Sequence, residues 1–150
     1  MPALFTFGRV LFAVLFIYSG ATKLFDIQNT TSAIASKVVI PALVTPYTDQ
    51  LEALAGGMKT PHMLALAVGI FEIMAGLMIA VNFAARFFAI LLIFFVLLAT
   101  FYFHDFWNQA SPENGKTLID ALKNLSIIGA LFMIAGYGRG ARSSEPAYDV

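Results

Sequence analysis

A few ionisable side chains interrupt the otherwise apolar stretches of this sequence, and these are the residues that could do chemistry. Glu72 stands near the middle of one long apolar segment, and Arg9 stands inside another. Ionisable groups in such segments are costly and almost always face a partner or a wet cavity. The two residues therefore predict either an ion pair that fixes helix packing or a site that binds a proton or a ligand.

We expect Arg9 to be the partner of Glu72. At about 1.5 Å of rise per residue, Arg9 lies roughly 7 Å and Glu72 roughly 13 Å from the same end of their segments. An arginine side chain can close that gap. Ala65, Gly69 and Gly76 share a helix face with Glu72. Because small residues let a second helix approach closely, Glu72 should point into a helix–helix interface.

A second group of polar residues gathers at the opposite end of the apolar segments. Lys123 should turn outward or pair with Asp120, Asp105 or Asp26. The group is either an interfacial belt with a snorkelling lysine, or a polar pocket in which His104 carries a proton or donates a hydrogen bond. Its members are Lys23, His104, Asp105, Trp107, Asp120, Lys123 and Asn124.

The sequence lacks the residues of several other kinds of site. It contains no cysteine, which excludes thiolate nucleophiles, iron–sulfur clusters and cysteine-ligated zinc. Its two histidines, His62 and His104, lack the spacing of metal ligands. We therefore expect no metal site, and we identify no catalytic residue. Any redox role would depend on a bound cofactor or on a partner protein.

The elements that must position these residues follow from the composition. Of the 150 residues, 59% are hydrophobic and 12% are charged, whereas a soluble domain carries about 25% charged residues. The mean hydropathy is +0.81, and the formal net charge is zero. The chain has too few charged side chains to cover a surface in water and no basic surface for nucleic acid. We therefore expect a lipid bilayer around it.

The apolar residues form four segments, each close to the roughly 20 residues that span a bilayer core. They lack the alternation of strands, and only helices and closed barrels satisfy backbone polar groups in lipid. We predict an all-α integral membrane four-helix bundle, a single transmembrane domain over residues 1–150. The first segment resembles a signal peptide, but its hydrophobic region begins late, and we expect it to be retained. The predicted spans are 4–24, 62–81, 83–103 and 118–137, followed by a polar C-terminal tail over 138–150.

The first loop, from about residue 26 to 61, is long. We expect it to carry short interfacial helical segments at 31–39 and 50–55, with Pro41 and Pro46 as helix breakers.

The other two loops are short, and they bear on orientation. Asn82 and Phe83 predict a tight turn, and residues 109–116 predict a short polar loop. With four spans, both termini lie on one side of the membrane. Positive residues in short loops and near span ends favour the cytoplasm, so we expect both termini to be cytoplasmic. The arginines on that side are Arg9, Arg86, Arg139 and Arg142.

Small and polar residues recur along the chain in a particular order. They are Gly8-Arg9, Tyr18-Ser19-Gly20 followed by Lys23-Leu24, Pro61, Gly69-x-x-Glu72-x-x-x-Gly76, Arg86, Phe103-His104-Asp105-Phe106-Trp107, and Lys123-Asn124 with Gly129. Together they resemble the DoxX family over nearly the whole chain. The match makes Tyr18 and Ser19 further candidates for a buried polar or ligand-binding site.

The resemblance implies four transmembrane helices in a small protein of the bacterial inner membrane. The DoxX family is related to the DoxD small subunit of thiosulfate:quinone oxidoreductase. Some members are linked to membrane oxidoreductase complexes in oxidative-stress defence, and a distant branch includes chaperones for receptor assembly. A fold of this kind does not by itself dictate chemistry.

Three functions follow as expectations. The first is a redox-associated membrane subunit that binds a quinone or another lipid-soluble ligand in its bundle, at most as the membrane subunit of an oxidoreductase. The second is a non-catalytic accessory or assembly subunit of a larger membrane protein complex. The third is a small proton-linked carrier in which Glu72 is the proton site.

Overall fold

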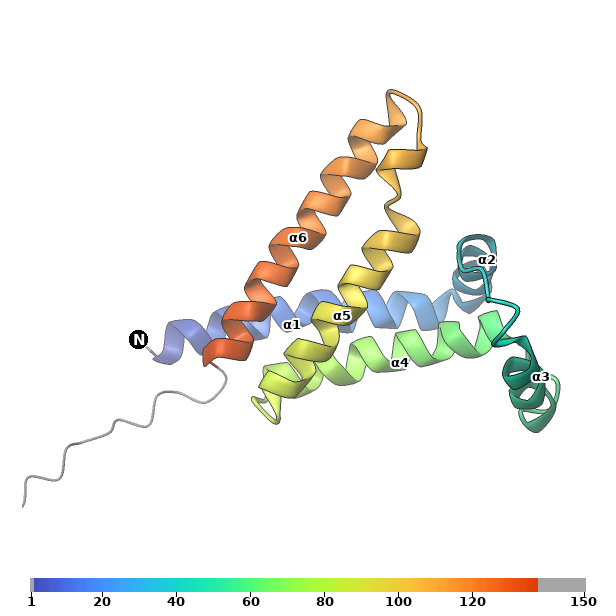
Figure 1. Ribbon diagram of the computed structural model, residues 1–150. Coiled ribbons are helices and arrows are strands. Elements are labelled where there is room, and N and C mark those ends of the chain that lie inside the picture. Colours follow the sequence, from blue (N-terminus) through green and yellow to red (C-terminus); the bar gives the residue numbers. More distant parts are fainter. Residues whose placement is uncertain (1, 138–150) are drawn as a thin grey trace, which may run out of the picture.

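Helices make up most of the part of the chain that the structure describes, residues 2–137 of a computed structural model (Figure 1). This confirms the predicted all-α class. The predicted tail over 138–150, with Arg139 and Arg142, lies outside the described residues. In chain order the elements are α1 (Pro2–Phe25), α2 (Ile27–Lys37), α3 (Thr45–Leu54), α4 (Thr60–Ala80), α5 (Ala85–Phe103), the 3₁₀ turn η1 (Phe106–Asn108) and α6 (Glu113–Tyr137).

Four of the described helices are long and apolar enough to cross a membrane. A helix needs roughly 20 residues to span a bilayer core. Large apolar side chains such as Phe87 and Phe94 are exposed on their outer faces, where lipid tails would cover them. The protein is therefore an all-α membrane bundle, as predicted. The candidate spans are Ala3–Phe25, Thr60–Ala80, Ala85–Asn108 and Glu113–Tyr137.

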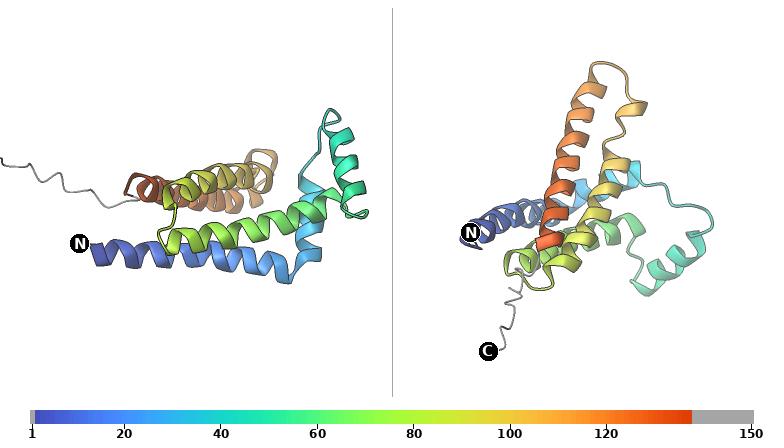
Figure 2. Two further views of the ribbon diagram at one scale, coloured as in Figure 1. Left: turned by 90° about the horizontal axis from the view of Figure 1, so that it is seen from below. Right: turned by 60° about the vertical axis from the view of Figure 1, so that its left-hand side comes forward.

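The four long helices form two antiparallel pairs. Helix α1 packs along α4, and α5 packs along α6. Figures 1 and 2 show that the two pairs meet near the turn between α4 and α5 and diverge toward the end that carries α2 and α3. Where the pairs meet, Ile79, Leu92 and Leu131 are fully buried. The pairs are thus joined by an apolar core at one end and separated at the other.

Glycines allow the backbones of α1 and α4 to touch. A Cβ atom added at Gly20 would lie 2.5 Å from the carbonyl oxygen of Gly69, and one added at Gly76 would lie 3.1 Å from the carbonyl oxygen of Ala13. Ala65, Gly69, Glu72 and Gly76 are all buried, so the predicted face of small residues does lie in a helix–helix interface. This contact fixes the register of the two helices.

The turn between α4 and α5 is tight, as predicted, but it ends later than expected. Asn82 and Ala84 have positive φ angles of 59° and 46°, and α5 begins at Ala85 rather than at residue 83. Side chains with a Cβ atom rarely adopt such angles, although asparagine tolerates them better than most. Because Asn82 and Ala84 adopt left-handed angles, residues 82–84 stay in the turn and α5 begins only at Ala85.

The long first loop carries two helices, longer than the predicted segments. Helix α2 begins at Ile27, directly after α1, rather than at residue 31, and α3 begins at Thr45 rather than at residue 50. Pro46 lies in the first turn of α3, where its missing N–H group would have no helical partner. Pro46 therefore lies at the start of α3, and α2 ends at Lys37, before both prolines that were expected to break it.

Helix α6 also begins earlier than its apolar residues do. The predicted polar loop over 109–116 contains the first turn of this helix, which starts at Glu113. Polar residues in a first turn do not contribute to an apolar pattern, so hydropathy placed the boundary at residue 118.

A carboxylate from the first loop caps the start of α4. Glu52 of α3 accepts hydrogen bonds of 2.8 Å from the backbone N–H and the hydroxyl of Thr60, and it pairs with Lys59 at 2.9 Å. The N–H groups of a first helical turn have no intrahelical partner, and a negative charge there is favourable. Glu52 thereby connects α3 to the start of α4.

We expect acidification to release α3 from α4. The hydrogen bonds from Lys59 and Thr60 lower the pKa of Glu52 from 4.5 to about 2. A lowered folded-state pKa contributes stability that is present above pH 4.5 and is lost as the pH falls toward 2. Hydrogen-exchange protection of residues 45–54 should fall over that range, and Glu52→Gln should lack this pH dependence. Equal protection of the unmodified protein at both pH values would contradict the assignment.

We expect Gly20→Ala to force α1 away from α4, because its new methyl group would collide with the backbone of Gly69. Overpacking of this kind costs about 1–3 kcal/mol. The matched control is Gly129→Ala, since a Cβ atom there meets nothing within 4 Å. Thermal unfolding in detergent, followed by circular dichroism, should show a lower Tm for Gly20→Ala alone. Equal Tm values for the two variants would show that the backbones are not in contact.

Candidate functional site

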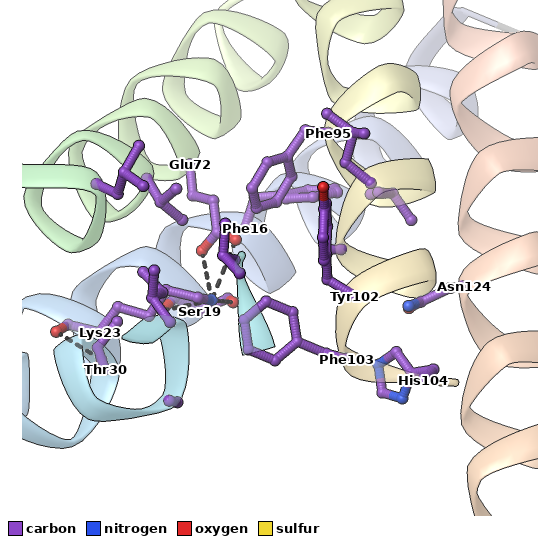
Figure 3. Close-up of a pocket in the computed structure, with 18 of the residues that line it drawn as sticks. Phe16, Ser19, Lys23, Thr30, Glu72, Phe95, Tyr102, Phe103, His104 and Asn124 are labelled. Carbon is purple, nitrogen blue, oxygen red and sulfur yellow. Dashed lines mark hydrogen bonds and ion pairs between the residues drawn. The ribbon is translucent and has the colours of Figure 1, made fainter. Parts of the chain in front are cut away.

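A cavity of about 540 Å³ lies where the two helix pairs diverge. Its walls come from α1, α2, α4, α5 and α6, and they are mainly apolar. Figure 3 shows Phe16, Phe95 and Phe103 among the apolar side chains, and Ile34 and Val68 also line the cavity. Cavities that bind small molecules have volumes of about 300–1,000 Å³ and apolar walls with a few polar groups. The cavity therefore has the size and lining of a ligand site.

An ion pair between α1 and α4 lies in one wall of this cavity. The Lys23 ammonium group is 2.9 Å and 3.1 Å from the two carboxylate oxygens of Glu72 and donates a hydrogen bond of 2.6 Å to Ser19 Oγ. The side chain of Glu72 is 3% exposed and that of Lys23 is 31% exposed. The carboxylate is therefore enclosed, while the ammonium group can still reach the cavity.

The expected pair between Arg9 and Glu72 does not form. Arg9 instead donates a hydrogen bond of 3.5 Å to the carbonyl oxygen of Ala80. In the glycine-mediated register, Gly20 lies against Gly69, which places Glu72 beside the C-terminal half of α1. Estimating the depth of each residue from its helix end cannot detect this register. The estimate therefore predicted Arg9 rather than Lys23 as the partner of Glu72.

Polar side chains on α5 and α6 form the opposite wall. Figure 3 shows Tyr102, His104 and Asn124 on the side of the cavity away from Lys23 and Glu72. Asn124 donates a hydrogen bond of 2.9 Å to Thr100. The cavity thus offers polar groups on two facing walls with an apolar space between them.

A salt bridge joins α2 to the end of α5. Lys37 lies 3.3 Å from Asp105, and Gln109 also donates a hydrogen bond of 3.3 Å to that carboxylate. The side chains of Lys37 and Asp105 are 42% and 21% exposed. Water therefore screens the pair, and its contribution to the stability of the fold is modest. It nevertheless connects α2 to the segment after α5 on the side where the two helix pairs diverge.

Besides Arg9 and Asp105, four of the predicted site residues lie outside the lining of the cavity. Asp120 and Lys123 pair with each other at 2.9 Å on the exposed face of α6, which is one of the alternatives expected for Lys123. Trp107 contacts Phe101 and is half exposed. Tyr18 is 70% exposed and points away from the bundle interior.

The structure also adds residues that the sequence did not single out. Tyr102 and Thr30 line the cavity, and Lys37 supplies the salt bridge to Asp105. Tyr102 stands in an aromatic run that is typical of a membrane interface, and Thr30 and Lys37 belong to a loop. Only the position of α2 against α4 reveals that Thr30 lines the cavity, and only the approach of α2 to the end of α5 reveals the salt bridge of Lys37.

The fold and the cavity define a small helical-bundle membrane protein with a partly polar interior chamber. The chain belongs to the DoxX family, which matches residues 4–105. It is similar to the inner membrane protein YphA of Escherichia coli (strain K12), with 27% identity over 144 residues, 96% of this chain and 89% of that protein. No solved structure shows significant similarity to the chain.

We expect Lys23→Met to cost more stability than Glu72→Gln. The first variant leaves an enclosed carboxylate without its cation, at a cost of about 3 kcal/mol, whereas the second leaves an ammonium group that can still reach the cavity. The double variant should recover part of the loss, with a coupling energy of at least about 1 kcal/mol.

The control is the pair Arg9→Met and Glu72→Gln, whose effects should add. Each pair of substitutions, with its double variant, forms a double-mutant cycle, and unfolding free energies from a urea titration in detergent give the coupling energy of each cycle. Additive effects in the Lys23 cycle, or coupling in the Arg9 cycle, would contradict the ion pair.

Proposed function

We propose that this protein binds a lipid-soluble ligand with a carbonyl-bearing headgroup, such as a quinone, in the cavity between its helix pairs. The observation that carries the proposal is the 540 Å³ chamber whose wall contains the Lys23–Glu72 ion pair. A chamber that served only packing would not need an enclosed charge pair in its wall, since replacing such a pair with apolar residues often preserves stability.

The residues of the cavity fit a quinone. Quinone carbonyl oxygens accept hydrogen bonds, and Lys23 and Ser19 on one wall and Tyr102, His104 and Asn124 on the other are potential donors. The apolar side chains between these walls suit a flat ring and an isoprenoid tail. The two facing groups of donors would orient the quinone ring. The Lys23 ammonium group of the ion pair would place N–H protons close to that ring.

The redox role rests on a partner. A bound quinone supplies two-electron chemistry, while this chain contains no cysteine for thiol chemistry. We therefore place the protein as the membrane subunit of an oxidoreductase complex, within a single transmembrane domain. Its relative YphA is named as an inner membrane protein, which supports the same location for this chain.

The charges of the described helices support an orientation with both termini in the cytoplasm. Arg9 and Arg86 lie toward the end that carries Pro2 and Tyr137, and residues 2–16, 76–90 and 128–137 around them contain no carboxylate. A C-terminal alkaline phosphatase fusion checks this orientation, because the enzyme is active only outside the cytoplasm. An active fusion would overturn it.

The test compares quinone binding by two variants that add the same side chain. Ala99 lines the cavity, whereas Ala67 is exposed on the outer face of α4. We expect quinone to copurify with the unmodified protein from its native membrane, and a short-chain quinone to raise its Tm. Ala99→Trp should abolish both effects because it fills the cavity, and Ala67→Trp should preserve them.

The outcomes separate the expected functions. Loss of quinone in Ala99→Trp alone supports the proposal. Absence of quinone and of any Tm shift in the unmodified protein, together with a stoichiometric partner protein in native gels, would instead support a non-catalytic accessory or assembly subunit.

A further inference from the structure

A second cavity lies between α1 and α6, near the end of the bundle that carries Pro2 and Tyr137. Its volume is about 460 Å³, and apolar side chains such as Leu4, Phe12 and Met133 line it together with Arg9. Arg9 is the charged residue of this lining. The cavity is separate from the chamber beside Lys23 and Glu72, so binding in it is independent of the proposed function.

Arg9 has more hydrogen-bond donors than the described part of the chain satisfies. Its guanidinium group carries five N–H bonds, and its hydrogen bond is the 3.5 Å contact to the carbonyl oxygen of Ala80. Its Nε atom is buried and has no hydrogen-bond partner among residues 2–137. Unsatisfied donors are costly, and Arg9 lines the cavity, so the cavity favours a ligand whose acceptor oxygens reach the guanidinium group.

The charge at this end of the bundle favours an anion. Arg86 also lies here, with a hydrogen bond of 3.4 Å to the carbonyl oxygen of Gly136. The helical segments around both arginines, residues 2–16, 76–90 and 128–137, contain no aspartate or glutamate. Two guanidinium groups without a carboxylate in these segments create a positive region beside an apolar cavity.

We propose that this cavity binds an anionic phospholipid, with the phosphate group on Arg9 and an acyl chain along the apolar side chains of α1 and α6. Two observations favour a lipid over a free anion. Leu4 and Met133 are 69% and 61% exposed at the sides of the cavity, so it is open to the bilayer. Arg9 lies about 10 Å along α1 from Pro2, a depth from which an arginine side chain reaches the headgroups.

The experiment compares two lipids with the same acyl chains. Phosphatidylglycerol and phosphatidylcholine are added in equal amounts to the detergent-purified protein, and retained lipid is counted by native mass spectrometry. We expect about a fivefold preference for phosphatidylglycerol, since one arginine near an anionic surface has an effect of that order. Inorganic phosphate alone, at the same concentration, should not displace it.

Three variants locate the site. Arg9→Gln should remove the preference, and Arg86→Gln, whose residue does not line the cavity, should preserve most of it. Gly8→Leu places a side chain at a cavity position where a Cβ atom meets nothing within 4 Å. It should reduce lipid retention with Arg9 intact, and so it tests the site even if Arg9→Gln does not fold.

Several results would overturn the proposal. Equal retention of the two lipids would exclude recognition of the anion, and an unchanged preference in Arg9→Gln or Gly8→Leu would place the lipid elsewhere. Displacement by inorganic phosphate would show that the site takes a free anion rather than a lipid.

Discussion

The ion pair between Lys23 and Glu72 is the contact on which the rest of this structure depends. An enclosed carboxylate is tolerated only beside a cation or other hydrogen-bond donors, and Lys23 can reach it only because Gly20 and Gly69 bring the two backbones together. The resulting register of α1 and α4 places Ser19 and the pair in one wall of the cavity between the helix pairs. The packing of two helices and the chemistry of the site therefore share one origin.

Much of the fold was predictable from the sequence, because bilayer thickness and apolar length are physical constraints that a single chain displays. The four spans, the tight turn after α4 and the face of small residues around Glu72 all appear in the structure. The partner of Glu72 was not predictable by the same means. Arg9 and Lys23 are both basic residues of the first span, and only the glycine contact sets which of them meets the carboxylate. The early starts of α2, α3 and α6 were missed because polar helical turns leave no apolar signal.

The divergence of the two helix pairs gives the molecule two different ends. At the wide end, polar side chains from both pairs face a chamber, and the salt bridge between Lys37 and Asp105 spans the gap. At the narrow end, Arg9 and Arg86 contact the last carbonyl groups of neighbouring helices. Among the charges within the spans, Lys23 and Glu72 thus form an enclosed pair beside the chamber, whereas Arg9 and Arg86 make the opposite end positive.

The rate at which Lys23 reacts with a membrane-permeant acylating reagent tests the central claim most directly. Peptide mass spectrometry would compare it with Lys59, whose side chain is 78% exposed against 31% for Lys23. The structure predicts slow labelling of Lys23 and faster labelling in Glu72→Gln, and the proposed quinone site predicts slower labelling when a short-chain quinone is added, with Lys59 unchanged. Labelling of Lys23 as fast as that of Lys59 and unaffected by Glu72→Gln would contradict the ion pair, and labelling unaffected by the quinone would contradict the proposed ligand site beside it.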